Sequence, residues 1–282
     1  SHNRLNGLHA SISNCRLLSR LNLASNLFSS IPPVVCTLTA MTDLRFERNE
    51  LTVLTPLIGN LVELRMFDIS ENKLETLPRT IGNLSALVEL NCNDNNISSL
   101  PPSLKDLFSI QRINISSNKL KLLPTDVTGL TSLKRLAISG NELQSLPPEV
   151  GVMSSLTELL LDGNQLNTLP LSIGRLTELQ VLNLDGNRLS LLPPEVAGMT
   201  ALRELWVHDN KLSVVPEGIA DLTNLNVLTL SNNELTVLPA NMTRLVSLNE
   251  LWIKDNNLKS HPFRQGLLPN LRLLLVDMGV KV

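Results

Sequence analysis

Three polar residues that could together bind a metal ion recur at one fixed interval in the second half of the chain. Asp162, Asp185 and His208 lie 23 residues apart, and carboxylate oxygens and imidazole nitrogens are common metal ligands. If the interval corresponds to one structural unit, the three side chains stack about 5 Å apart. No compact loop gathers further ligands around them, so we predict no bound metal and no cofactor, and interpret His208 as a partner contact or polar surface.

The sequence also lacks the residue patterns of nucleophilic and phosphate-transfer chemistry. The four histidines are far apart in sequence, without a Ser or Cys in register: His2, His9, His208 and His261. Glycines such as Gly59, Gly82, Gly151 and Gly174 recur at multiples of 23 residues, which indicates turns rather than a phosphate loop. With a formal net charge of −2, we predict a protein that is not an enzyme and does not bind nucleic acid.

The strongest candidate for a binding surface is a column of apolar residues that includes both tryptophans. Trp206 and Trp252 are separated by two of these intervals, which places them about 10 Å apart. Leu160 shares their column, and Val181 and Val227 occupy the adjacent one. An apolar strip on a polar face indicates an interaction site, and tryptophan is enriched among binding hot spots. The alternative is that each indole lies flat and merely shields the sheet.

The charges around this strip are mostly negative. The acidic residues are Glu158, Asp162, Asp185, Glu204, Asp209, Glu250 and Asp255, and the basic ones are Arg188, Lys211 and Lys254. A partner should therefore present basic residues around an apolar surface. The predicted partner-binding residues are Leu160, Asp162, Val181, Asp185, Trp206, His208, Val227, Trp252 and Lys254.

A repeat that covers almost the whole chain must position these residues. Asparagines recur every 23 residues, at Asn3, Asn26, Asn49, Asn72, Asn95, Asn118, Asn141, Asn164, Asn187, Asn210, Asn233 and Asn256. The frame around one of them reads Leu156-x-x-Leu159-x-Leu161-x-x-Asn164-x-Leu166. Its Leu-x-Leu alternation predicts a short strand. A Leu-Pro step then ends the strand, and an apolar segment such as residues 172–176 suits one helical or 3₁₀ turn.

One strand and one turn cannot bury a core alone, so the coils must stack and share their leucines. The side chains between the leucines then remain on the open face of the sheet. The asparagine amide has both donors and acceptors, and we predict that it satisfies main-chain groups buried at the turn after each strand. The asparagines therefore form a structural ladder, to which we assign no binding role.

The motif L-x-x-L-x-L-x-x-N-x-L, followed by L-P-x-x-I-G-x-L, resembles the leucine-rich repeat. A 23-residue unit with the Leu-Pro step is similar to the intracellular Ras-group class, which includes Ras-pathway scaffolds, the repeats of yeast-type adenylyl cyclase and plant Ras-group proteins. The resemblance implies an α/β fold: a right-handed βα solenoid with a concave parallel sheet and short helical or 3₁₀ turns on the convex side. We expect a single domain, 1–282, of about 12 coils, with an irregular last coil or diverged cap at 262–282.

We predict that the protein is a non-catalytic protein-interaction module whose concave face binds a folded partner in intracellular signalling. The resemblance suggests a small Ras-like GTPase or a phosphatase as that partner. Three scattered cysteines favour a reducing, cytoplasmic compartment, and no apolar run is long enough to span a membrane.

Because the sequence begins and ends inside a repeat, we expect a fragment of a longer protein. The alternatives are a regulatory region of a larger cyclase, kinase or phosphatase and an extracellular receptor, which glycosylation at Asn83 or Asn241 would favour. Oligomeric state stays open.

Overall fold

The computed structural model describes residues 3–261, 263 and 268–277. The chain divides into two compact units, Ser1–Glu142 and Leu143–Val282, and each is built from the same repeated coil. Of the predicted irregular last coil, positions 262, 264–267 and 278–282 lie outside the described residues, as do positions 1 and 2 at the other end. None of the described helices is long and apolar enough to cross a membrane.

In the described residues of the first unit, six short parallel strands are each paired in register with the next along the chain. They are β1 (Arg20–Asn22), β2 (Asp43–Arg45), β3 (Met66–Asp68), β4 (Glu89–Asn91), β5 (Arg112–Asn114) and β6 (Arg135–Ala137). Its 3₁₀ turns are η1 (Ala10–Asn14), η2 (Pro33–Thr37), η3 (Pro56–Asn60), η4 (Arg79–Asn83), η5 (Pro102–Asp106) and η6 (Thr125–Gly129).

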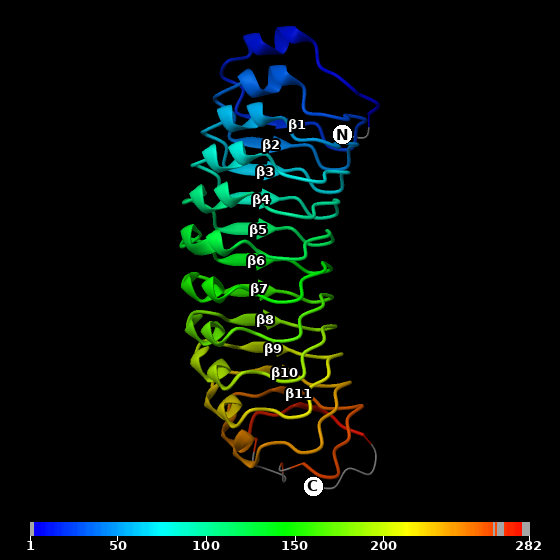
Figure 1. Ribbon diagram of the computed structural model, residues 1–282, viewed down its shortest axis with the longest axis vertical. Helices are drawn as coiled ribbons and strands as arrows, with labels where there is room; N and C mark the ends of the chain where they lie inside the picture. The colour runs from blue at the N-terminus through cyan, green and yellow to red at the C-terminus, as the bar shows by residue number, and fades with distance from the viewer. Residues whose placement is uncertain (1–2, 262, 264–267, 278–282) are drawn as a thin grey trace. The chain divides into compact units, whose positions relative to one another are not determined.

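The second unit repeats this arrangement, again with strands paired in chain order. Its strands are β7 (Glu158–Leu160), β8 (Val181–Asn183), β9 (Glu204–Trp206), β10 (Val227–Thr229), β11 (Glu250–Trp252) and β12 (Leu273–Leu275). Its 3₁₀ turns are η7 (Pro148–Val152), η8 (Leu171–Arg175), η9 (Pro194–Gly198), η10 (Glu217–Asp221) and η11 (Ala240–Arg244). Within each unit the turns form a separate column beside the strands (Figure 1). The predicted parallel sheet and 3₁₀ turns are thus confirmed.

The core of each unit is the layer between strands and turns. The central strand residues point into it, and Leu182 and Leu205 have no exposed surface. The turns contribute a second apolar residue, such as Ile173, which is also fully buried. Leucines at the same repeat position therefore stack on one another from coil to coil, and each coil depends on its neighbours for burial.

The asparagine of each coil connects that coil to the one before it. Asn187 Nδ2 donates to the carbonyls of Leu161, 3.0 Å away in the preceding coil, and Leu184, 2.9 Å away in its own. Its Oδ1 accepts the backbone N–H of Leu166 at 3.0 Å. The same cross-coil donation is made by Asn49, Asn72, Asn95, Asn118 and Asn141 in the first unit and by Asn210, Asn233 and Asn256 in the second. The predicted structural ladder is confirmed.

The residue before each asparagine adopts a left-handed backbone conformation, which the sequence analysis did not predict. In the first unit these residues are Ser25, Arg48, Glu71, Asp94, Ser117 and Gly140, and in the second Gly163, Gly186, Asp209, Asn232 and Asp255. Gly, Asn and Asp tolerate this conformation best. Their enrichment at this position was therefore a readable signal of a tight turn.

Glycine has a different role in the 3₁₀ turns, where it allows close packing between coils. A Cβ on Gly174 would overlap the carbonyl of Glu195 in the next turn, and one on Gly151 would overlap the carbonyl of Ser172. A side-chain bond links two of the same turns, because Ser172 Oγ donates to the carbonyl of Pro148 at 2.6 Å. These glycines are structural turn residues, as their spacing predicted.

Candidate partner-binding face

The strand register of the second unit brings the predicted apolar residues into two neighbouring columns. Strand pairing aligns Leu160, Asn183, Trp206, Thr229 and Trp252 in one column. The adjacent column consists of Glu158, Val181, Glu204, Val227 and Glu250. The five apolar members are partly exposed, on the face of strands β7–β11 that points away from the core. We call this surface the tryptophan face.

The two tryptophans differ in how their indole nitrogens are satisfied. Trp206 Nε1 donates to Glu204 Oε2 at 3.1 Å, two residues back on the same strand. Trp252 has Glu250 at the equivalent position. Yet Trp252 Nε1 is covered from solvent and has no hydrogen-bond partner among the described residues. An indole N–H is a donor only, so Trp252 is the less satisfied of the two.

Thr229 lies between the two tryptophans in the same column. Only 1% of its surface is exposed, although it belongs to the outward-facing side of its strand. Its hydroxyl accepts the backbone N–H of Val207 at 3.1 Å. The column therefore places a buried threonine between two partly exposed tryptophans.

The polar members of the predicted site lie two residues past the strand ends. Asp185 Oδ1 accepts the backbone N–H of His208 at 2.6 Å, and burial raises the pKa of the Asp185 carboxyl. His208 Nδ1 lies 3.1 Å from the carbonyl of Ser231, and its Nε2 lies 3.0 Å from Asp209 Oδ2. In the described part of the chain, no three His, Cys, Asp or Glu side chains are arranged to hold a metal ion.

Lys254 supplies an exposed positive charge at the far end of the tryptophan face. Its Nζ lies 3.8 Å from Asp255 Oδ2, and its backbone N–H donates to Ser231 Oγ at 3.1 Å. Lys254 lies two residues beyond strand β11, and Asp162 occupies the same position beyond β7. The structure thus brings all nine predicted residues onto one face of the second unit. These residues form a partly covered surface with hydrogen bonds among its own side chains and backbone.

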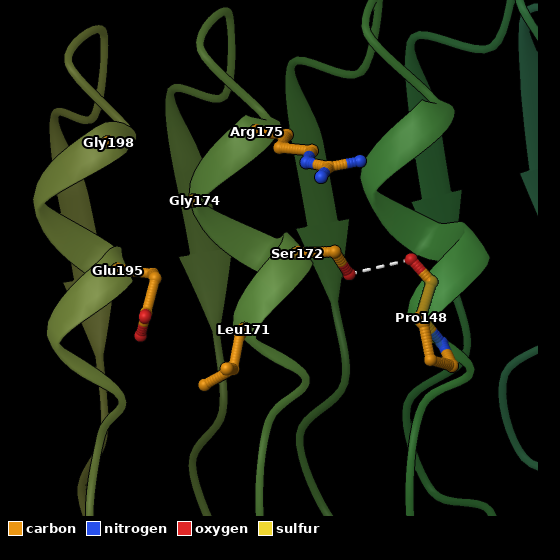
Figure 2. A pocket seen from close by; sticks show the side chains of 7 residues that line it. All are labelled: Pro148, Leu171, Ser172, Gly174, Arg175, Glu195 and Gly198. Carbon is orange, nitrogen blue, oxygen red and sulfur yellow. Dashed lines mark hydrogen bonds between the residues drawn. The ribbon is translucent and has the colours of Figure 1, made fainter.

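Sequence reasoning missed a hollow of about 560 Å³ on the 3₁₀-turn side of the second unit (Figure 2). Its lining residues are Pro148, Leu171, Ser172, Gly174, Arg175, Glu195 and Gly198. Leu171 is 64% exposed. A Cβ on Gly198 would overlap the carbonyl of Gly174, so this glycine allows the two turns to pack closely. The repeat pattern of the sequence carried no signal for the hollow.

A second hollow lies on the strand side of the first unit and was also not predicted. It has a volume of about 520 Å³ and is lined by Asn22, Ala24, Ser25, Glu47, Arg48, Asp68, Ser70, Glu71, Asn91 and Asn93. Most of these side chains are polar, and they belong to four consecutive coils. We call this hollow the acceptor hollow, because its unsatisfied groups are hydrogen-bond acceptors, as described below.

The sequence matches known repeat families. A family model described as "Leucine rich repeat" matches residues 131–189 and 200–258, and a second model with the same description matches residues 86–107. No curated protein sequence matches the chain. In contrast, 489 chains of solved structures match it, so the fold is common and does not by itself indicate one function.

Three of these solved structures illustrate the range. A leucine-rich repeat protein of Leptospira interrogans is 31% identical with a TM-score of 0.79, and the alignment covers 99% of this chain and 78% of that one. A TDR receptor is 25% identical with a TM-score of 0.86, over 97% of this chain and 50% of that one. Toll, in the Toll–Spätzle complex of Drosophila, is 25% identical with a TM-score of 0.82, and the alignment covers 91% of this chain and 36% of that one. This chain thus spans half of the TDR receptor chain and about a third of the Toll chain.

Proposed function

Because the chain belongs to the leucine-rich repeat family, we propose that it binds a folded protein partner through the tryptophan face. The partner presents an apolar surface against Trp206 and Trp252 and basic residues toward the surrounding carboxylates. The protein itself contributes recognition and no catalytic step.

The observation that carries this proposal is the alignment of both tryptophans on one partly exposed face. Tryptophan and its aliphatic neighbours lose accessible apolar surface when a partner covers them, which stabilises a complex. The indole N–H of Trp252 has no hydrogen-bond acceptor among the described residues. A small reorientation of this indole would let an acceptor of the partner satisfy it. Such a bond adds specificity to an otherwise apolar contact.

We further infer that this recognition takes place inside the cell, in signalling. All three cysteines are free: Cys36 and Cys92 are buried and Cys15 is exposed. Unpaired cysteines are typical of proteins from reducing compartments. The 23-residue Ras-group pattern points to a small Ras-like GTPase or a phosphatase as the partner class. The same module could serve as the regulatory region of a larger signalling enzyme.

A second candidate function is recognition at the cell surface, which the similarity to a TDR receptor and to Toll favours. Asn83 is exposed and Asn241 is partly exposed, and both stand in N-x-S/T sequences. Glycosylation of either residue in the native host, detected by mass spectrometry of the purified protein, would favour this function. Unmodified asparagines on a protein recovered from the cytosol would favour the intracellular one.

The proposal is tested by affinity capture from native lysate with the wild-type protein and with Trp206→Ala/Trp252→Ala. We expect at least one protein to be captured by the wild type and lost with the double variant. Repeating the capture with a non-hydrolysable GTP analogue tests the GTPase class, because only a nucleotide-dependent partner changes in abundance.

The matched control is Leu171→Ala, which removes an exposed apolar side chain from the 3₁₀-turn side of the same unit. This variant should capture the same proteins as the wild type. If the tryptophan variant keeps every partner and Leu171→Ala loses one, the binding surface lies on the turn side instead.

A further inference from the structure

The acceptor hollow of the first unit shares no residue with the tryptophan face of the second. Its lining residues come from the coils of strands β1–β4. Glu47, Asp68 and Glu71 bring carboxyl groups to it, and Asn22, Asn91 and Asn93 add amides. None of these residues was assigned a role by the sequence analysis.

Three of the hydrogen-bond donors around this hollow are used within the protein. Arg48 Nε donates to Glu71 at 2.9 Å. Asn91 Nδ2 donates to Asp68 Oδ2 at 3.1 Å, and Ser70 Oγ donates to Asp68 Oδ1 at 2.6 Å. None of these three donors is directed at Glu47.

The nearest other guanidinium is committed as well. Arg45 Nε donates to Asp43 Oδ1 at 3.0 Å, and Arg45 Nη2 lies 3.1 Å from Met66 Sδ. Arg45 and Arg48 both lower the pKa of Glu47 through their charge, but neither forms an ion pair with it among the described residues. A hydrogen bond with its own backbone also lowers the pKa of Glu47, but no side chain among the described residues pairs directly with this carboxylate.

Two acceptor oxygens at the hollow are left unsatisfied. Glu47 Oε2 and Asn91 Oδ1 are covered from solvent, and neither has a hydrogen-bond partner within the described part of the chain. Burial is the main reason why the pKa of Glu47 is raised, and the negative charge of Asp68 raises it further. Covered acceptors without a donor are unfavourable. A cationic donor entering the hollow would satisfy the oxygens and compensate the carboxylate charge.

We propose that the acceptor hollow binds the guanidinium group of an arginine side chain from a partner protein. A guanidinium carries several N–H donors in a planar fork, so it can reach a carboxylate and an amide oxygen together. A lysine ammonium lacks this fork. The terminal torsion of a glutamate is soft, so the Glu47 carboxylate can turn its unsatisfied oxygen toward the entering group.

This inference rests on the proposed function, because it takes the arginine from a protein partner, but it concerns a different unit and different residues. It also makes a statement that needs no partner at all: a small arginine derivative should occupy the hollow. The acceptor hollow can therefore be tested apart from the tryptophan face.

The experiment is an NMR titration of the whole chain with N-acetyl-arginine methylamide at pH 7. We expect saturable shifts of the Glu47 carboxyl carbon and the Asn91 side-chain amide, together with a fall in the pKa of Glu47. The citrulline derivative has nearly the same shape but no charge, and should cause shifts at least tenfold weaker at equal concentration. Glu47→Gln should abolish the response, whereas Glu75→Gln, at an exposed position outside the hollow, should retain it.

Three results would overturn the inference: no response to arginine, an equal response to citrulline, or a response to calcium chloride but not to arginine. Circular dichroism of Glu47→Gln verifies that the variant is folded. Trp206→Ala/Trp252→Ala should bind the arginine derivative as the wild type does. A different combination is that the wild type responds to the arginine derivative while Trp206→Ala/Trp252→Ala still captures every partner from lysate. That combination would contradict the proposed function and leave the arginine site supported.

Discussion

At the scale of single residues, the asparagine of each coil is a buried polar side chain whose hydrogen bonds fix its identity. Asn187 is only 7% exposed, and its amide serves carbonyls of two coils and one backbone N–H. Aspartate would lose the donors, and leucine would lose both donors and acceptor. The constant 23-residue spacing thus follows from a local hydrogen-bonding need that every coil shares.

We predict that Asn187→Ala lowers the free energy of unfolding by roughly 3 kcal/mol, because it leaves several buried main-chain groups unsatisfied. Asn167→Ala is the control, since Asn167 is exposed and makes no side-chain hydrogen bond in the described structure. Urea denaturation followed by circular dichroism measures both. Equal midpoints for the two variants would show that the ladder contributes little.

Glu47 gives a prediction about pH. Burial raises the pKa of Glu47 in the folded state. At pH values between the ordinary glutamate pKa and this raised pKa, the folded protein therefore binds more protons than the unfolded chain. Stability must then fall as pH rises through this window. Glu47→Gln removes the titration, so the variant should gain stability relative to wild type as pH rises above the ordinary glutamate pKa of about 4.3. Thermal melts of both proteins across this range test it, and a relative loss with rising pH would contradict it.

At the scale of elements, the strands and 3₁₀ turns could be predicted because apolar periodicity and the Leu-Pro step are written directly in each coil. The columns of the tryptophan face were predictable for the same reason, since parallel pairing in register preserves the 23-residue spacing. The left-handed residue before each asparagine was missed although Gly, Asn and Asp are enriched there, because serine, arginine and glutamate occupy the position in other coils and make the pattern less regular. The hollows depend on side-chain packing between coils, which spacing alone does not determine.

The left-handed turn predicts a clear difference between two substitutions at Gly186, whose φ is +63°. Gly186→Val should lower the free energy of unfolding by about 1–2 kcal/mol, because a β-branched residue is strained in this conformation. Gly186→Asn should cost less than half as much, since Asn232 adopts a φ of 51° at the same repeat position. Chemical denaturation measures the free energy of unfolding of both variants. Equal losses of stability would mean that the space available to a side chain at position 186, and not the backbone conformation, determines the cost.

At the scale of the whole molecule, the two units offer different surfaces built on the same coil. The first carries the acceptor hollow, and the second carries the tryptophan face. Leucines and asparagines repeat because they maintain the stack, whereas the side chains between them vary from coil to coil. The sequence could therefore predict the fold in detail, while the identity of a partner depends on residues that the fold does not constrain.

The cysteines provide a check on burial across the chain. Burial raises the pKa of Cys36 to about 11 and that of Cys92 to about 12, so both thiols stay protonated and covered at pH 8. Cys15 is exposed. A thiol reagent should label only Cys15 rapidly in the native protein and all three cysteines in denaturant. Rapid labelling of the Cys15→Ser variant would indicate that a core cysteine is accessible.

The most direct test of the central claim is the affinity of a purified partner, identified by the capture experiment, for wild-type protein and for Trp206→Ala/Trp252→Ala. Calorimetry should show a dissociation constant at least about 30-fold weaker for the double variant, equivalent to about 2 kcal/mol for the loss of hot-spot residues. Leu171→Ala should bind like wild type, and circular dichroism should show that all three proteins are folded. Unchanged affinity of a folded double variant would contradict the account.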